Sequence, residues 1–297
     1  MSVRTVLVTI VLALVVAGSA GAGAAPNRLD RTLGTVVPAA RIHNLFWDDA
    51  WSTQHPTFTR GMINTFTARI TSTGYAGSLG EYGVTPPTFA GSQSASPICG
   101  ATQAPNFVTT AAVISWLLCE VNVPGTGVPF PGIRSPISND LYVVYLPSNT
   151  RISDSMGIPQ ITLLGRVFGP YTVSHTSCDD YGAYHYWAVS VTAYFAFAII
   201  PTRCAVNADN DRPPLDNITL AASHEIVEAT TNPFVGLGWI DRSIPISAPG
   251  FRRLSEGEAS DICDFLPTPA APVRRPSSGG SLFSPYWSNA AGACVTH

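Results

Sequence analysis

Apolar residues recur at helical spacing in three segments of the chain. The segment 56–73 predicts an amphipathic helix, and the segment 109–119 predicts a buried one. The segment 215–230 predicts a third helix, with Asp216 or Asn217 as the candidate N-cap. This third helix also holds the motif that carries most of the functional information.

Three other segments have the composition of strands. The segment 40–47 predicts a first strand, and the continuous apolar run 141–146 is typical of a strand in the interior of a sheet. The segment 186–200 is rich in β-branched and aromatic residues, which favours one or two central strands. The Pro- and Ser-rich segment 86–97 and the Pro- and Gly-rich segment 124–136 predict loops.

The N-terminus has the pattern of a secretory signal peptide. Arg4 is the only charge before the apolar run 6–17, and small residues fill positions 18–25. We therefore expect residues 1–25 to be removed and 26–297 to form a single secreted domain of the α/β or α+β class. The alternative is an uncleaved membrane anchor, but its apolar core is shorter than the ~20 residues that span a bilayer. After cleavage we expect no membrane association.

Composition narrows the range of partners. Only 12% of the residues are charged, half the usual share of about 25%, and the net charge is −3. Basic residues form no run longer than a pair, so nucleic acid is not an expected partner. An even number of cysteines in an exported chain predicts disulfides, and pairing of neighbours along the chain, which closes three modest loops, is the preferred pattern. Cysteine-ligated zinc is the alternative, although no C-x-x-C spacing occurs. The six are Cys99, Cys119, Cys178, Cys204, Cys263 and Cys294.

The third helix contains the motif His224-Glu225-Ile226-Val227-Glu228. Positions i and i+4 of a helix share a face, so His224 and Glu228 can bind one ion, and imidazole and carboxylate are both zinc ligands. Glu225 lies about 100° further round the helix and can reach a water molecule on that ion. This is the geometry of H-E-x-x-H zinc hydrolases with a carboxylate in place of the second histidine, which makes the site more anionic. The alternative is an ordinary amphipathic helix with two surface glutamates.

A metal site needs a third protein ligand. The segment 256–264 is acidic in a chain otherwise poor in charge, and Asp261, which lies close to a cysteine, is its first candidate, followed by Glu258. A solvated acidic loop is the alternative. His185 is a further candidate for binding metal or substrate, although a histidine among aromatic residues is more often packed in a core. Trp239 follows the helix and is a candidate wall of the site, with simple packing as its alternative.

Six sequence elements occur together in one order. They are Gly74 to Val84, similar to S-x-Y-x-x-x-L-x-x-Y-G-V; the apolar run 141–146; Cys178 with Tyr181 to His185, similar to C…Y-C-G-Y-H; Ser223 to Pro233, similar to A-H-E-L-A-E-x-x-T-N-P; Glu258 to Cys263, similar to E-I-G-D-L-C; and Tyr286 to Cys294, similar to W-S-N-A-x-x-x-C. With them the chain resembles the phosphate-induced, EXORDIUM-like proteins of plants and their secreted bacterial relatives. Gly182 replaces the family's second cysteine in the third element, so the family's disulfide pattern does not transfer directly.

The resemblance implies an extracellular protein, related to plant proteins linked to growth signalling, with a zincin-like domain. Such a domain would have a central mixed sheet and a metal-site helix, stapled by disulfides. By position, His224, Glu228 and Asp261 would bind Zn²⁺ and Glu225 would be the general base. Two functions follow. The favoured one is a secreted zinc-dependent hydrolase, above all a metallopeptidase acting on an extracellular peptide or cell-wall substrate. The alternative is a non-catalytic extracellular protein, in signalling or in the cell wall, with a structural metal.

Overall fold

The computed structural model describes most of the chain after the predicted signal peptide; residues 1–25 themselves lie outside the described part. The described residues are 29–31, 35–48, 51, 58–100, 102–128, 137–158, 161–163, 166–168, 171–179, 181–190, 193–206, 212–235, 237–241, 257–265 and 281–296. Within these ranges, no helix combines the length and the apolar character needed to cross a bilayer.

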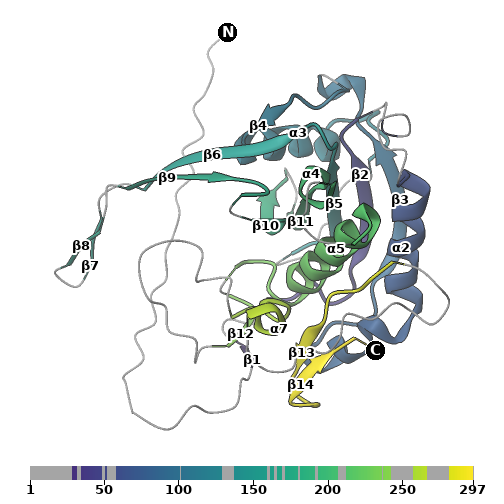
Figure 1. Ribbon diagram of the computed structural model, residues 1–297, viewed down its shortest axis with the longest axis vertical. Helices are drawn as coiled ribbons and strands as arrows, with labels where there is room; N and C mark the ends of the chain where they lie inside the picture. The colour runs from purple at the N-terminus through teal and green to yellow at the C-terminus, as the bar shows by residue number, and fades with distance from the viewer. Residues whose placement is uncertain are drawn as a thin grey trace.

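A five-stranded mixed sheet forms the centre of the molecule (Figure 1). In spatial order its strands are β10 (Tyr184–Val189), β11 (Tyr194–Pro201), β5 (Asp140–Leu146), β2 (Arg41–Phe46) and β3 (Thr88–Ser94). From β11 to β3 all neighbours are parallel, whereas β10 runs antiparallel to β11. The central strand β5 is buried along its whole length, as its continuous apolar composition predicted.

Helices cover both faces of this sheet (Figure 1). One face carries α2 (Arg60–Ser72) and α5 (Pro214–Thr231), and the other carries α3 (Thr110–Asn122). Side chains of a strand alternate between faces, so Leu141 packs in the core beneath α2 and α5 while Tyr142 packs in the core beneath α3. The structure therefore confirms a mixed α/β fold with a central mixed sheet.

Two details of the predicted elements are wrong. The segment 86–97 was expected to be a loop, but it contains the edge strand β3. An edge strand is half exposed and needs few apolar residues, and this one is also bulged opposite Ile42 and His43, with Gly91 at φ +124°. The N-cap of α5 is Pro213, and Asp216 lies in the first turn, where its negative charge complements the helix dipole.

Shorter elements complete the fold. They are the 3₁₀ helices η1 (Gly74–Tyr82) and η2 (Pro97–Cys99), the helices α4 (Thr202–Val206) and α7 (Asp261–Phe265), and the strands β1 (Leu29–Arg31), β4 (Phe107–Val108), β6 (Arg151–Ile158), β7 (Ile161–Leu163), β8 (Arg166–Phe168), β9 (Tyr171–Thr176), β12 (Trp239–Asp241), β13 (Tyr286–Ser288) and β14 (Ala293–Val295). Strands β6 and β9 form a ribbon that projects from the body, with β7 and β8 at its far end (Figure 1).

Three disulfides join cysteines that are neighbours along the chain, as predicted. The pairs are Cys99–Cys119, Cys178–Cys204 and Cys263–Cys294. All six cysteines are thereby used, which rules out the alternative of a cysteine-ligated zinc. The third bridge matters most for the candidate site, because it links α7 to β14.

We expect Leu141→Ala to lower the free energy of unfolding by about 2–5 kcal/mol, because Leu141 is fully buried on the central strand and its loss leaves a cavity. Urea denaturation of the oxidised protein measures this. The matched control is Ile98→Ala, since Ile98 is 53% exposed and its truncation should change stability by no more than about 0.5 kcal/mol. Equal effects of the two substitutions would contradict the observed burial.

Candidate metal centre

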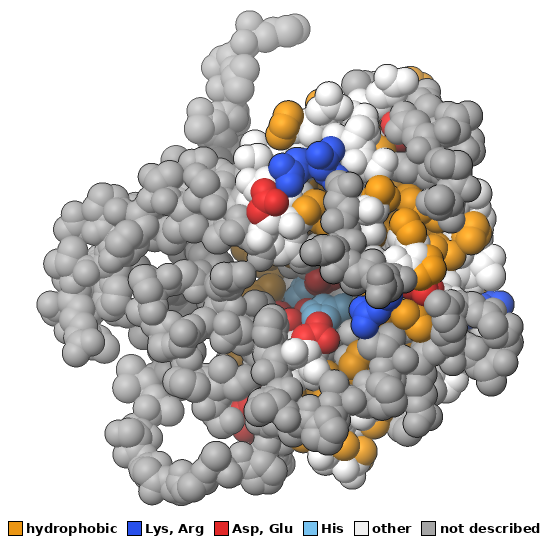
Figure 2. All heavy atoms as spheres, in the orientation of Figure 1, with side chains coloured by type: hydrophobic (Ala, Val, Ile, Leu, Met, Phe, Trp, Pro, Cys, Tyr) orange, Lys and Arg blue, Asp and Glu red, His pale blue; other side chains and the backbone are white. Residues whose placement is uncertain are grey.

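Seven ionisable side chains from three parts of the chain form one cluster. They are His185 from β10; His224, Glu225 and Glu228 from α5; and Glu258, Asp261 and Asp264 from the segment 257–265. Figure 2 shows acidic and histidine side chains gathered at the middle of one face of the molecule. Most of the cluster is nonetheless buried, and Asp264 is its exposed member, with 48% of its side chain accessible.

The sheet and α5 determine which side chains enter the cluster. Helix α5 packs Ala222 and Ile226 into the core beneath it, so His224, Glu225 and Glu228 lie on other sides of the helix. On β10, His185 pairs with Ala198 of β11, whose side chain lies in the core shared with α5. Paired residues of antiparallel strands point to the same face, so His185 also points toward α5.

His224 lies at the centre of the predicted three-ligand group. Its Nε2 atom is 3.1 Å from Oδ1 of Asp261 and 3.2 Å from Oε1 of Glu228. Its Nδ1 atom faces the other way and lies 3.2 Å from Oδ2 of Asp264. The structure thus brings together the three residues that sequence analysis proposed as ligands, and their donor atoms are close enough to hold one metal ion.

The acidic segment 257–265 is fixed against α5 by several contacts. The backbone N–H of Asp261 donates a hydrogen bond to Oε1 of Glu228, at 3.1 Å. The N–H of Trp287 donates to the carbonyl of Ala259, at 2.7 Å, and so ties the segment to β13. The Cys263–Cys294 bridge adds a covalent link to β14. Asp261 is therefore held between two fixed points, the Ala259 hydrogen bond before it in the chain and the Cys263 disulfide after it.

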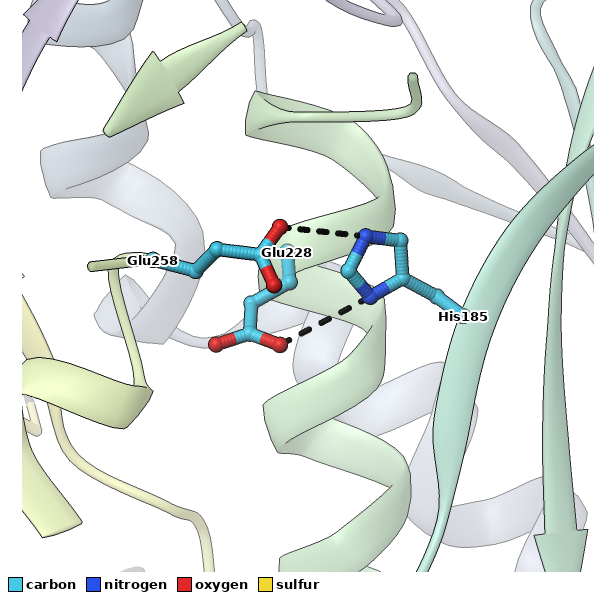
Figure 3. A group of neighbouring side chains, drawn as sticks. All are labelled: His185, Glu228 and Glu258. Carbon is cyan, nitrogen blue, oxygen red and sulfur yellow. Dashed lines mark ion pairs between the residues drawn. The ribbon is translucent and has the colours of Figure 1, made fainter. Parts of the chain in front are cut away.

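His185 occupies the other half of the cluster (Figure 3). Its Nδ1 atom lies 3.2 Å from Oε2 of Glu225 and 3.6 Å from Oε2 of Glu228. Its Nε2 atom lies 3.3 Å from Oε1 of Glu258 and 3.2 Å from the carbonyl oxygen of Asn232. The two ring nitrogens thus face different groups, and Glu228 contacts both histidines.

Burial and mutual charge shift the pKa values of these groups. Burial raises the pKa of Glu228 well above its usual value, and the negative charge of Asp261 adds to this. Burial likewise raises the pKa of Asp261 to about 6, against the opposing effect of His224. For both histidines, burial alone would lower the pKa, but the surrounding carboxylates outweigh it and hold the pKa well above its usual value. The cluster therefore favours bound positive charge.

The cluster contains more acidic than basic groups. In the part of the chain that the structure describes, every ion pair of its five carboxylates is made with His185 or His224. Two imidazoles cannot neutralise five carboxylates even when both are protonated. Unpaired buried charge is costly, and either protonation of carboxyl groups, which the raised pKa values of Glu228 and Asp261 favour, or a bound metal ion, which the donor set could hold, would reduce this excess.

Among the described residues, the polar and ring contacts of Trp239 are made outside this cluster. Its indole Nε1–H donates to the carbonyl of Tyr82, at 2.9 Å, and its ring packs on the Tyr82 ring. Trp239 therefore packs against Tyr82, which is the alternative to its role as a wall of the site.

A cavity of about 470 Å³ lies away from the cluster, at the beginning of β2 and β5, where Arg41 and Asn139 line it.

Sequence reasoning missed two residues that support the cluster. Asp264 was part of the acidic segment, but its role beside His224 was not recognised. The available signal was its i, i+3 spacing from Asp261, which puts both carboxylates on one side of a helix. Asn232 ends α5, and its side-chain amide donates to Oε1 of Glu258. Nothing in the sequence pattern indicated this second contact.

A close approach at Gly238 sets the position of Asn232. The N–H of Gly238 donates to Oδ1 of Asn232, at 2.6 Å, and a Cβ atom at position 238 would meet the Thr231 carbonyl and lie 2.5 Å from Cα of Asn232. We expect Gly238→Ala to destabilise the protein by about 1–3 kcal/mol, because backbone atoms must move. Thermal unfolding measures this. The control Gly77→Ala, where a Cβ meets no atom within 4 Å, should be close to neutral.

No family model, no curated protein and no solved structure matches this chain. The likeness to EXORDIUM-like proteins therefore stays a prediction from short sequence elements.

Proposed function

We propose that this protein is a secreted metal-dependent hydrolase, with zinc bound by His224, Glu228 and Asp261 and with Glu225 as general base. The observation that carries the proposal is the position of His224, whose Nε2 faces two carboxylates at 3.1 and 3.2 Å. Its other nitrogen faces Asp264, the arrangement in which a carboxylate orients a metal-binding histidine. Three disulfides are compatible with the extracellular compartment that the N-terminal pattern predicts.

The donor atoms fit a zinc ion in kind and in spacing. Zinc is bound by imidazole nitrogen and carboxylate oxygen at about 2.0–2.2 Å, so two ligands of a tetrahedral site lie about 3.3 Å apart. The distances from Nε2 of His224 to Glu228 and Asp261 match this value. The donor oxygens of Glu228 and Asp261 lie within 4.8 Å of each other.

In the proposed reaction, the bound ion and the side chains of the protein would supply different parts of the catalysis. A bound zinc would polarise the carbonyl of the substrate and lower the pKa of a bound water molecule. Glu225, on the next position of the same helix, would take the proton of the attacking water and pass it to the leaving group. Its Oε2 atom lies 3.2 Å from Nδ1 of His185, so the carboxylate is close to the second histidine of the cluster. Peptide hydrolysis is the favoured reaction, and an extracellular peptide or cell-wall polymer is the substrate class.

The carboxylate of Glu228 also sets a limit on this activity. Two anionic ligands neutralise the charge of a divalent ion, whereas the H-E-x-x-H arrangement leaves it more positive. A less positive ion acidifies its water less. We therefore expect slower hydrolysis than an H-E-x-x-H centre would support.

A second function has its own supporting observation, the burial of the cluster. Glu228 is 2% exposed and Glu258 is 1% exposed, so little of this site faces solvent directly. A closed site is typical of a structural metal. The alternative is therefore a non-catalytic extracellular protein, in signalling or in the cell wall, with a metal that stabilises the fold. A distant relationship to EXORDIUM-like proteins is compatible with either function and is itself a proposal.

Glu225→Gln tests which of the two functions holds. The purified mature protein should contain zinc or another divalent metal by elemental analysis, and the substitution should leave that content unchanged. Hydrolysis of a mixed peptide library, followed by mass spectrometry, should be lost in Glu225→Gln because the amide cannot accept the proton. Glu81→Gln, outside the cluster, serves as the control and should keep full activity. Metal content without any hydrolysis in the unmodified protein would favour the structural role, and protein without metal would overturn both.

Asp264→Asn tests the orientation of His224. The amide keeps the size of the side chain but loses the charge that holds Nδ1 of His224, so zinc should bind about 10–100-fold more weakly. Competition with a chromogenic chelator measures this affinity. Asp179→Asn is the matched control, because Asp179 is an exposed carboxylate paired with Arg151 and should not affect zinc. An unchanged affinity in Asp264→Asn would contradict the assigned role.

A further inference from the structure

We propose that the cluster holds a second divalent cation, bound by His185, Glu228 and Glu258, and that Glu228 bridges the two cations. The inference rests on the proposed metal site, because it shares Glu228 with that site. It changes the expected centre from one metal ion to a pair. Two features point to the pair: the positions of the two oxygens of Glu228, and the contacts of the His185 ring.

The carboxylate of Glu228 directs one oxygen to each histidine. Its Oε1 atom lies 3.2 Å from Nε2 of His224, and its Oε2 atom lies 3.6 Å from Nδ1 of His185. This is the disposition of a carboxylate that bridges two ions. Ions in two-metal hydrolytic sites lie about 3.5–4 Å apart, a spacing that a single carboxylate spans.

His185, Glu228 and Glu258 form a second group with the spacing of metal ligands. Their donor atoms all lie within 4.8 Å of one another. Figure 3 shows the three side chains converging from β10, from α5 and from the segment before α7. A group drawn from three separate elements, with each side chain buried, does not arise from the periodicity of one helix.

The hydrogen bonding of His185 leaves one nitrogen suited to a metal. Nε2 lies 3.2 Å from the carbonyl oxygen of Asn232, and a carbonyl can only accept, so Nε2 carries the proton that is donated. In the neutral ring the lone pair is then on Nδ1, which lies 3.6 Å from Oε2 of Glu228 and 3.2 Å from Oε2 of Glu225. Glu258 contacts Nε2 through Oε1, at 3.3 Å, so Oε2 would be its ligand atom for a cation at Nδ1. A backbone carbonyl on the outer nitrogen is one of the usual partners that orient a metal-binding histidine.

The kinds of donor atom indicate which cations suit the second group, which offers one imidazole and two carboxylates. Imidazole and carboxylate together suit zinc, manganese or iron, whereas magnesium and calcium favour sites made of oxygen alone.

Metal stoichiometry tests the inference. The mature, oxidised protein is stripped with a chelator, titrated with zinc chloride in a calorimeter, desalted and analysed for zinc. We expect two zinc ions per chain in the unmodified protein and one in each of His185→Gln and His224→Gln. His43→Gln, which alters a buried histidine paired with Asp140 outside the cluster, should retain two.

The possible failures are distinguishable. One zinc per chain, lost in His224→Gln but kept in His185→Gln, would overturn the second site and leave the proposed function standing. No zinc in the unmodified protein would overturn both. A measurement on the unmodified protein avoids any folding defect of the variants: two manganese ions bridged by Glu228 should give an exchange-coupled electron paramagnetic resonance spectrum. The six-line spectrum of an isolated ion at saturating manganese would overturn the inference.

Discussion

Helix α5 buries Ile218, Ala222 and Ile226 against the central sheet, and this contact determines where the other faces of the helix point. Burial of an isoleucine side chain contributes about 1.5–3 kcal/mol, so the apolar face holds the helix firmly in rotation as well as in position. The ionisable residues of the motif, His224, Glu225 and Glu228, therefore face the segment 257–265 and β10. The sheet contributes to the same end, because strand alternation turns His185 toward α5.

The acidic groups are brought together at an electrostatic cost that the fold offsets only in part. Asn232 and the N–H of Asp261 each donate to a glutamate of the cluster, and the two histidines pair with the rest. Charge-assisted hydrogen bonds of this kind are strong, yet they leave the excess of negative charge in place. The free energy gained by burying the apolar core therefore has to outweigh the repulsion between these carboxylates. Such local electrostatic strain is often found at functional sites.

Much of the fold could be predicted because its signals are local. The apolar run of β5 and the helical spacing of apolar residues in α5 indicate burial whichever elements pack against them. The edge strand β3 could not, since its exposed, bulged backbone needs no apolar pattern. The grouping of His224, Glu228 and Asp261 could be predicted because the i, i+4 spacing on one helix and the acidity of the segment 256–264 are visible in the sequence. The pairing of His185 with Glu225 and Glu258 depends on strand register, which becomes fixed only when β10 joins the sheet.

The bridge between Cys263 and Cys294 makes the geometry around Asp261 sensitive to the redox state of the chain. Asp261 and His224 are 37 positions apart, and in a reduced chain the acidic segment would lack its covalent link to β14. The bridge joins cysteines 31 positions apart, and a closed loop of that length stabilises the folded state by roughly 3–4 kcal/mol on the chain-entropy account. Reduction of this bridge would leave Asp261 held by backbone hydrogen bonds of its segment to Glu228 and Trp287. The position of Asp261 beside His224, and with it any metal affinity of the proposed centre, would therefore depend on the redox state of one cystine.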